Sequence, residues 1–325
     1  MSLFQLDIYM TALCLAGTFW YNSTFTYKPE FCSQQITITE TIESDVIHIP
    51  LIRAGKLLLI EAKIDDKIGN LVFDTGSAGL VLNSTYFRDY VKTFNSISQG
   101  ITGSIESTHS ITIDSICFGD LIYRNERADL VDLSHIENSR GIRVYGLIGF
   151  SHLRNFEVVI DIQNSQLTLF RVDKKGNKMN KNVEHFFKPD IVETIEESNN
   201  VVFFTGLIAG KPIKLCFDTG AEISSISNSL PRSILSTISI TRRKSLIGAS
   251  TVRRDVLFGI INDFKLGNKS YYGMEAIITN LSSLESVYDK KFGGIVGYDF
   301  LSKGIVSINI RKKQMGICYY NAEEE

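Results

Sequence analysis

Short runs in which hydrophobic and polar residues alternate dominate the chain and predict β-strands. Two examples are SITIDSICF at 110–118 and VSINI at 306–310, and such runs are bounded by Gly, Asn and Asp. Alternation places successive side chains on opposite faces of a strand, and the bounding residues favour turns. Long stretches with helical periodicity are nearly absent. The pattern therefore predicts a mostly β fold.

Two blocks of this pattern occur twice along the chain. LVFDTGSAGL at 71–80 is echoed by LCFDTGAEIS at 215–224, so that Asp218 follows Asp74 by 144 residues. Further along, GLIGFSHL at 146–153 is echoed by GIVGYDFL at 294–301, an offset of 148 residues. Self-similarity at a fixed spacing indicates a repeated structural unit. We therefore expect two related halves.

Each half carries an Asp directly into an apolar setting. Three hydrophobic residues precede Asp74 and Asp218, and an ionised carboxylate there is costly unless it is paired. We expect the two carboxyls to face each other, so that they cannot both ionise and share one proton. Such a pair combines a base with an acid and can activate a water molecule. Gly149 and Gly297 are expected beneath the two Asp-Thr-Gly turns, where a side chain would collide with the turn.

On these motifs the chain resembles the aspartic peptidases, as two retropepsin-like halves fused in one polypeptide in the bilobed arrangement of the pepsins. The resemblance implies two β-barrel lobes related by a pseudo-twofold axis, with a central cleft for substrate. It implies Asp74 and Asp218 as catalytic residues. It also implies supporting roles in the two loops for Thr75, Gly76, Ser77, Thr219, Gly220 and Ala221. The threonine hydroxyls would hydrogen-bond to the opposite loop.

A flap that closes over substrate is also implied by the resemblance. The candidate residues are Gly100, Ile101, Thr102 and Gly103, since two glycines give the backbone freedom that lids use. A related hairpin is expected at 246–253. Neither segment has the tyrosine that pepsin-like flaps present, and two ordinary hairpins are the alternative interpretation.

The two motifs differ in the residue after Gly, which is Ser77 in the first and Ala221 in the second. A serine hydroxyl can donate to the outer oxygen of a neighbouring carboxylate and favour its charged form. We therefore expect Ser77 to donate to Asp74, and Asp74 to carry most of the negative charge.

Composition places the boundaries and excludes several partners. The domains expected are an N-terminal segment at 1–35, a first lobe at 36–172, a linker at 173–196, a second lobe at 197–320 and an acidic tail at 321–325. Residues 8–27 carry no charge, so the first segment could be a secretory signal or a membrane anchor, and export or tethering is favoured over a cytoplasmic location. The 34 basic and 36 acidic residues nearly balance, which argues against nucleic-acid binding.

No cofactor and no metal are expected, because the five cysteines and five histidines show no ligand spacing. Both halves lie in one chain, which favours a monomer over pairing between chains. The predicted function is an aspartic endopeptidase that acts on extended peptide or protein segments at acidic to mildly acidic pH. The alternative is a catalytically silent peptide-binding or scaffold module with the same fold.

Overall fold

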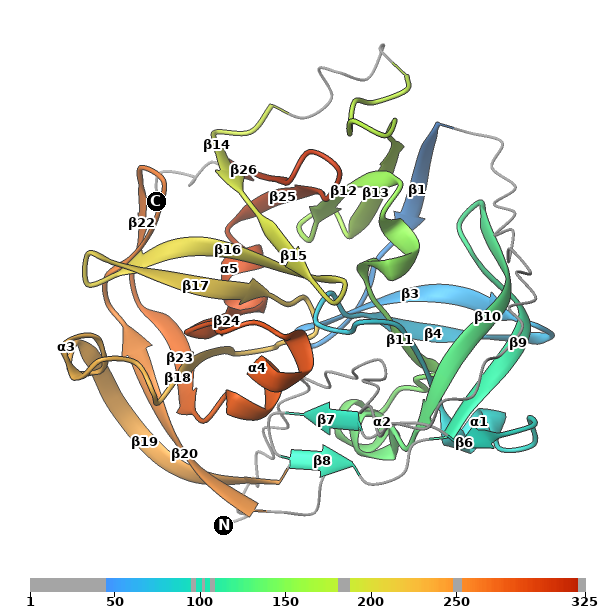
Figure 1. The fold of residues 1–325 in the computed structure, drawn as a ribbon, viewed down its shortest axis with the longest axis horizontal. Coiled ribbons are helices and arrows are strands. Elements are labelled where there is room, and N and C mark those ends of the chain that lie inside the picture. The colour runs from blue at the N-terminus through green and yellow to red at the C-terminus, as the bar shows by residue number, and fades with distance from the viewer. Residues whose placement is uncertain are drawn as a thin grey trace, which may run out of the picture.

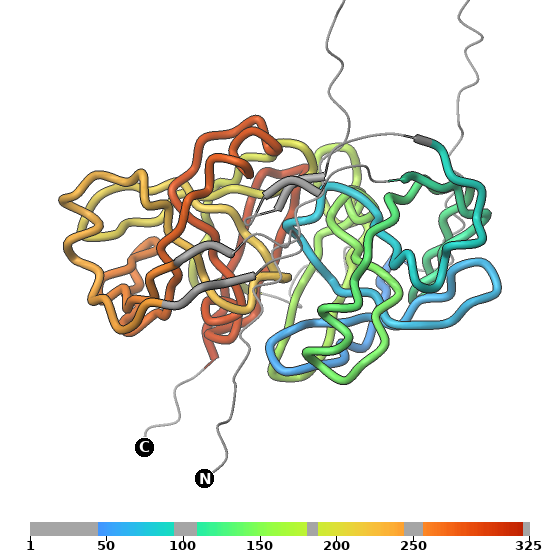
Figure 2. Tube along the Cα trace, turned by 90° about the horizontal axis from the view of Figure 1, so that it is seen from below, coloured from blue at the N-terminus to red at the C-terminus, as the bar shows by residue number. Residues whose placement is uncertain are grey.

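The computed structural model describes residues 45–94, 98–100, 103–105, 109–180, 188–247 and 253–320, with the backbone alone at 94, 98–100, 103–105, 244–247 and 253–255. The segment expected to be a signal or anchor and the acidic tail both lie outside these residues. Strands dominate the described chain, which confirms the mostly β prediction. Figure 1 shows two lobes, and Figure 2 shows them side by side when seen from below.

The first lobe is built on an eight-stranded sheet. In sheet order its strands are β2 (Ile52–Ala54), β3 (Leu57–Ile64), β4 (Lys67–Phe73), β11 (Gly146–Ile148), β5 (Leu80–Asn83), β10 (Leu121–Val131), β9 (His109–Phe118) and β6 (Thr93–Phe94). An additional pairing between β3 and β9 closes the six strands from β3 to β9 into a barrel. The end of β4 and all of β11 are buried, in agreement with their unbroken hydrophobic sequences.

The second lobe is built on a ten-stranded, curled sheet. In sheet order its strands are β19 (Ile238–Ile247), β20 (Arg253–Ile261), β23 (Met274–Thr279), β18 (Ser224–Ser227), β24 (Gly294–Val296), β17 (Lys211–Phe217), β16 (Val201–Ile208), β21 (Phe264–Leu266) and β22 (Lys269–Tyr271), with β15 (Glu196–Ser198) pairing to β16. Strands β17 and β24 run parallel here, as β4 and β11 do in the first lobe. Equivalent strand pairs therefore lead into the two Asp-Thr-Gly turns.

A six-stranded sheet joins the lobes. Its order is β1 (Val46–Pro50), β13 (Gln166–Arg171), β12 (Phe156–Asp161), β25 (Gly304–Asn309), β26 (Gln314–Tyr319) and β14 (Ile191–Thr194). At its centre β12 pairs antiparallel with β25, and Val159 lies opposite Ser307, 148 residues later. The separation equals the repeat offset at this pair and changes by two residues per step on either side, as expected where a pseudo-twofold axis passes between the strands. The range expected as a linker contains β14, which adds an edge strand to this sheet.

Helices are few and short. They are α1 (Ser84–Phe87), α2 (Ser134–Arg140), α3 (Arg232–Leu235), α4 (Ser282–Tyr288) and α5 (Tyr298–Leu301), together with a 3₁₀ turn, η1 (Phe150–Leu153). Two short strands, β7 (Ser98–Gly100) and β8 (Gly103–Ile105), form a separate hairpin. None of the helices within the described residues has the length and hydrophobicity to cross a bilayer.

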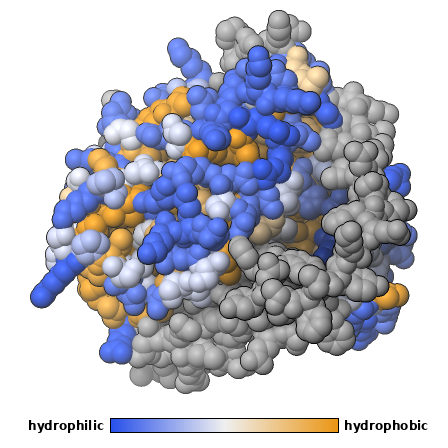
Figure 3. Space-filling model, viewed as in Figure 1, coloured by the Kyte–Doolittle hydropathy of each residue, from blue (hydrophilic) through white to orange (hydrophobic). Residues whose placement is uncertain are grey.

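Hydrophobic side chains fill the barrel, the curled sheet and the space between them. One large cluster runs from β1 and β3 of the first lobe through to β26, so the lobes share a core. On the face shown in Figure 3, hydrophilic side chains cover most of the coloured surface, with smaller hydrophobic areas between them. The shared core fixes how the ends of β4 and β17 meet.

Candidate active site

Asp74 and Asp218 follow the last residues of β4 and β17, and the structure brings them together. Their exposed fractions are 1% and 0%. The backbone N–H of Asp74 donates to the Ile148 carbonyl at 2.9 Å, and the N–H of Asp218 donates to Val296 at 3.1 Å. Each parallel strand pair thus continues one residue into its turn and delivers an Asp to the interface between the lobes.

The glycines of the two turns show that the carboxyls face each other. A β-carbon at Gly76 would lie 2.7 Å from Cγ of Asp218, and a β-carbon at Gly220 would lie 2.7 Å from Cγ of Asp74. Any side chain at either position would therefore occupy the space of the opposite carboxyl. Glycine is required at both positions because the opposite carboxyl approaches so closely, and not because the backbone adopts an unusual angle.

Thr75 and Thr219 connect the two turns. The N–H of Thr75 donates to the Thr219 hydroxyl at 3.0 Å, and the N–H of Thr219 donates to the Thr75 hydroxyl at 2.9 Å. The hydroxyl of Thr75 donates to the Phe217 carbonyl at 2.9 Å, and that of Thr219 to the Phe73 carbonyl at 2.6 Å. These four bonds are the cross-links that the resemblance implies.

The turns also supply donors to the carboxyls. Gly76 N–H donates to Oδ1 of Asp74 at 2.9 Å, and Gly220 N–H donates to Oδ1 of Asp218 at 2.8 Å. Neither Oδ2 accepts a hydrogen bond from a donor in the described part of the chain. Two buried acceptors that face each other can be satisfied by a proton held between the carboxyls.

Burial raises the pKa of both carboxyls. The pKa of Asp74 lies well above its ordinary value, because burial disfavours the charge and the charge of Asp218 adds repulsion. Burial likewise raises the pKa of Asp218, while hydrogen bonds from Asp74 and from backbone N–H groups oppose the rise. The pair therefore holds a proton at a pH where an exposed Asp would be ionised.

The prediction for Ser77 was wrong. Its hydroxyl donates to the carbonyl of Gly79 at 2.9 Å and not to Asp74. A serine side chain can reach backbone acceptors two residues away, and here that acceptor competes successfully with the carboxylate. The hydroxyl thus gives no reason to place the negative charge on Asp74. Burial and the charge of Asp218 both raise the pKa of that carboxyl.

Gly149 and Gly297 lie directly beneath the two turns, as expected from their place after the second strand of each half. A β-carbon at Gly149 would lie 2.1 Å from the Ser77 carbonyl oxygen, and one at Gly297 would lie 2.0 Å from that of Ala221. No real contact is that short. Both positions therefore require glycine.

The flap candidate lies on the β7–β8 hairpin, where Gly100 pairs with Gly103. Ile101 and Thr102, which would form its turn, lie outside the described residues. Strand β7 lies next to α4 of the second lobe, so the hairpin extends from the first lobe to the second (Figure 1). In the related segment 246–253, Ile247 pairs with Arg253, and residues 248–252 lie outside the described residues.

Sequence reasoning missed the contacts by which each lobe holds the Asp-Thr-Gly turn of the other. Arg140, the last residue of α2, forms an ion pair with Glu222, which follows Ala221. Tyr288, the last residue of α4, donates from its hydroxyl to the carbonyl of Gly76 at 3.0 Å. The signal present in the sequence is that Arg140 and Tyr288 are 148 residues apart, the offset of the distal glycines. Because one residue is an arginine and the other a tyrosine, the sequence does not show that they occupy equivalent positions in the two halves.

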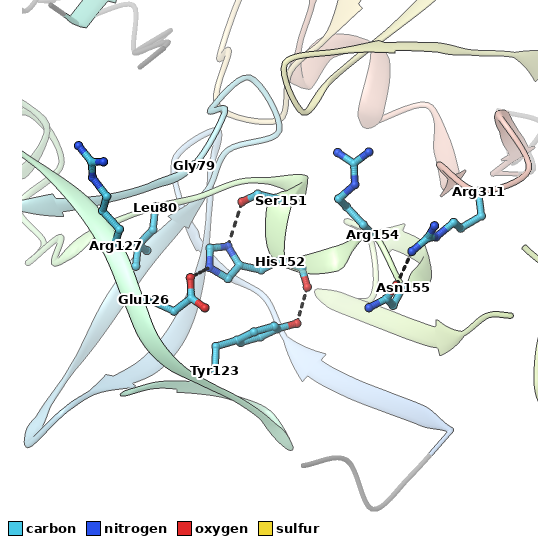
Figure 4. Close-up of a pocket in the computed structure, with 10 residues that line it drawn as sticks. All are labelled: Gly79, Leu80, Tyr123, Glu126, Arg127, Ser151, His152, Arg154, Asn155 and Arg311. Carbon is cyan, nitrogen blue, oxygen red and sulfur yellow. Dashed lines mark hydrogen bonds and ion pairs between the residues drawn. The ribbon is translucent and has the colours of Figure 1, made fainter. Parts of the chain in front are cut away.

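A pocket of about 380 Å³ adjoins the first catalytic loop at Gly79 (Figure 4). At its centre, the ring of His152 hydrogen-bonds to the Ser151 hydroxyl at 3.0 Å and to the Glu126 carboxylate at 3.2 Å. The charged groups that line the pocket bind to neighbouring protein groups, as Arg154 does to Glu197.

No group of three or more potential metal ligands from His, Cys, Asp and Glu occurs among the described residues. Cys117, Cys216 and Cys318 take part in no disulfide within the described residues.

Comparison with known families bears on the second half. Residues 204–300 match the family model described as Aspartyl protease, so an aspartyl protease domain occupies this range. The matched range includes Asp218, its turn and Gly297. A search of curated proteins found no match to the chain.

Proposed function

We propose that this chain is an aspartic endopeptidase in which two retropepsin-like halves supply one carboxyl each. The observation that carries the proposal is the facing arrangement of Asp74 and Asp218, each with a Gly of the opposite turn against it. The family match of residues 204–300 supports the same conclusion for the half that holds Asp218. The equivalent turn in the first half supports a complete pair within one chain.

In the proposed mechanism the carboxyl pair acts on a water molecule held between its members. The ionised Asp accepts a proton from the water as the water oxygen attacks the peptide carbonyl carbon. The protonated Asp donates its proton to the carbonyl oxygen, which forms a neutral gem-diol. Collapse of the gem-diol breaks the C–N bond: the amine leaves with the proton that the first Asp took from the water, and a gem-diol hydroxyl returns a proton to the other Asp as the carboxyl product forms. Both carboxyls return to their starting state without a covalent intermediate.

The substrate expected is an extended peptide segment, which can hydrogen-bond to strand-like backbone beside the carboxyls. The proximity of β7 to α4 supports a role for the β7–β8 hairpin in covering such a segment. Because one proton must remain on a pair whose pKa values burial raises, activity is expected at acidic to mildly acidic pH.

The test is cleavage of a mixed peptide library across pH by the wild-type chain and by Asp74→Asn and Asp218→Asn. Each substitution removes the acid–base pair at nearly constant volume, so each is expected to lower the cleavage rate by a factor of about 10⁴ or more. Asp89→Asn, at an exposed position of the first lobe, is the matched control and should cleave as the wild type does. Wild-type turnover retained in either active-site variant would refute the proposal.

A statine-containing peptide distinguishes the enzyme from a silent binding module. An enzyme should bind it tightly at acidic pH, because its hydroxyl mimics the gem-diol, and should also cleave library peptides. Binding of peptides without cleavage at any pH would favour the silent module.

A further inference from the structure

The side chain of Tyr288 reaches from the second lobe into the first catalytic loop. Its exposed fraction is 0%. The ring contacts Phe203 and Phe292, each with a centroid separation of 5.8 Å. A ring packed between two others has one position, so its hydroxyl is fixed at the Gly76 carbonyl.

Neighbouring side chains hold the end of α4 in place. The hydroxyl of Ser198 donates to the Tyr288 carbonyl at 2.6 Å, and the amide of Asn199 donates to the Val287 carbonyl at 2.8 Å. Ser198 is the last residue of β15, and Asn199 lies in the tight turn that joins β15 to β16. These bonds satisfy carbonyls that a helix end leaves without a partner in the helix.

The same turn makes a second contact to the loop. The amide of Asn200 donates to the carbonyl of Ala78 at 2.8 Å, and the guanidinium of Arg154 donates to the oxygen of that amide. Figure 4 shows Arg154 directed away from His152, on the far side of the pocket from Arg127. The second lobe thus donates to two carbonyls, those of Gly76 and Ala78, in the loop that carries Asp74.

The first of these bonds acts on a peptide unit that is directed at Asp74. The Gly76 carbonyl and the Ser77 N–H belong to one peptide group, and this N–H donates to the backbone carbonyl of Asp74 at 3.1 Å. The same N–H lowers the pKa of the Asp74 carboxyl, against the rise that burial causes. A hydrogen bond to a carbonyl polarises its peptide and strengthens the N–H on the other side.

We propose that Tyr288 is a positioning residue for the carboxyl pair, acting from the opposite lobe through the Gly76–Ser77 peptide. The inference rests on the proposed function for its effect on catalysis. Tyr288 fixes the direction of the peptide dipole that faces Asp74, so it favours the charged form of that carboxyl. Asn200 holds a second carbonyl of the same loop, that of Ala78.

The equivalent position in the first lobe has different chemistry. Arg140 binds the carboxylate of Glu222, a side chain of the second catalytic loop. Tyr288, in contrast, binds a backbone carbonyl of the first loop. The two loops are therefore supported by different bonds, although their turns are alike. This difference makes the two carboxyls inequivalent despite the pseudo-twofold axis.

The test uses Tyr288→Phe, which removes one hydroxyl and keeps the ring. Carboxyl carbons of Asp are titrated by NMR in the ¹³C-labelled chain, and the pH dependence of kcat/KM is measured on a cleaved peptide. We expect the Asp74 titration and the pH profile to move to higher pH, with kcat/KM lowered roughly five- to tenfold. The matched control is Tyr271→Phe, which removes a hydroxyl bonded to Tyr319 in the same lobe and should change neither measurement.

A second variant guards against failure of the first to fold. Asn200 has φ of 64°, which glycine adopts readily, so Asn200→Gly removes the donor to Ala78 and keeps the turn. It should move both measurements in the same direction by a smaller amount. Unchanged titration and profile in the folded variants would overturn the proposal. If the wild-type chain cleaves no peptide, the proposed function fails, and the NMR titration still decides the role of Tyr288.

Discussion

Thr75 and Thr219 exchange hydrogen bonds across the interface between the lobes, the N–H of each donating to the hydroxyl of the other. Each hydroxyl also donates to the strand residue before the opposite Asp. All four bonds are buried, so no water replaces them when one is lost. The two turns therefore behave as one rigid unit whose geometry depends on both lobes.

Thr219→Val is expected to destabilise the fold by about 2–4 kcal/mol, because it leaves the Thr75 N–H and the Phe73 carbonyl buried without the hydroxyl they bind. Urea denaturation followed by circular dichroism measures the change. Thr219→Ser keeps the hydroxyl and should recover most of the loss. Wild-type stability in Thr219→Val, or an equal loss in Thr219→Ser, would contradict the assignment of the effect to the hydroxyl.

Gly149→Ala is expected to destabilise the fold by about 3 kcal/mol or more, because its β-carbon would lie 2.1 Å from the Ser77 carbonyl oxygen and the turn must move. The midpoint of urea unfolding measures the cost. Gly79→Ala is the matched control in the same lobe, since a β-carbon there meets nothing within 4 Å. A Gly149→Ala protein as stable as this control would contradict the close approach.

The carboxyl pair is expected to make stability depend on pH. Asp74 has a folded-state pKa raised above its ordinary 3.8, so its contribution is fully present below that value and is lost as pH rises through the folded pKa. Asp74→Asn stays neutral throughout. It should therefore be more stable than the wild type at pH 7, and the advantage should shrink towards pH 4. Denaturant unfolding of both proteins at several pH values measures the difference, and an advantage that grows towards acid would show that the sign is wrong.

Arg140→Met is expected to cost about 2–4 kcal/mol, because Glu222 is buried and loses the guanidinium that compensates its charge. The double variant Arg140→Met/Glu222→Leu should recover most of this loss, since it removes both charges. A double-mutant cycle on unfolding free energies gives the coupling between the two side chains. Additive effects would mean that the ion pair contributes nothing to the joining of the lobes.

Local sequence was sufficient to locate the carboxyl pair. The hydrophobic lead-in to each Asp and the distal glycine are short-range patterns, and their recurrence at 144 and 148 residues gives the long-range pairing that neither motif provides alone. The mostly β fold followed from alternation in the same way. These features depend on the alternation of hydrophobic residues and on the spacing of motifs, both of which can be read from a single sequence.

The remaining features depend on contacts that spacing does not encode. Ser77 has two acceptors within reach, and only the folded loop decides that its hydroxyl binds Gly79. Tyr288 and Arg140 occupy equivalent helix ends with unlike side chains, so their common direction is a property of the packed lobes. Strand β14 has a short, partly polar sequence, and its place follows from the free edge that β26 offers.

The pairing of Val159 with Ser307 has a consequence for how the molecule melts. Neither half completes the sheet in which these residues lie, so a half that came apart would leave a long hydrophobic strand edge exposed to water. Heating should therefore give a single cooperative transition, in which the pairing of β12 with β25, the two Asp-Thr-Gly turns and the carboxyl pair are lost together. A chain built this way is expected to have no partly folded state in which one carboxyl of the pair remains in place after the other has left.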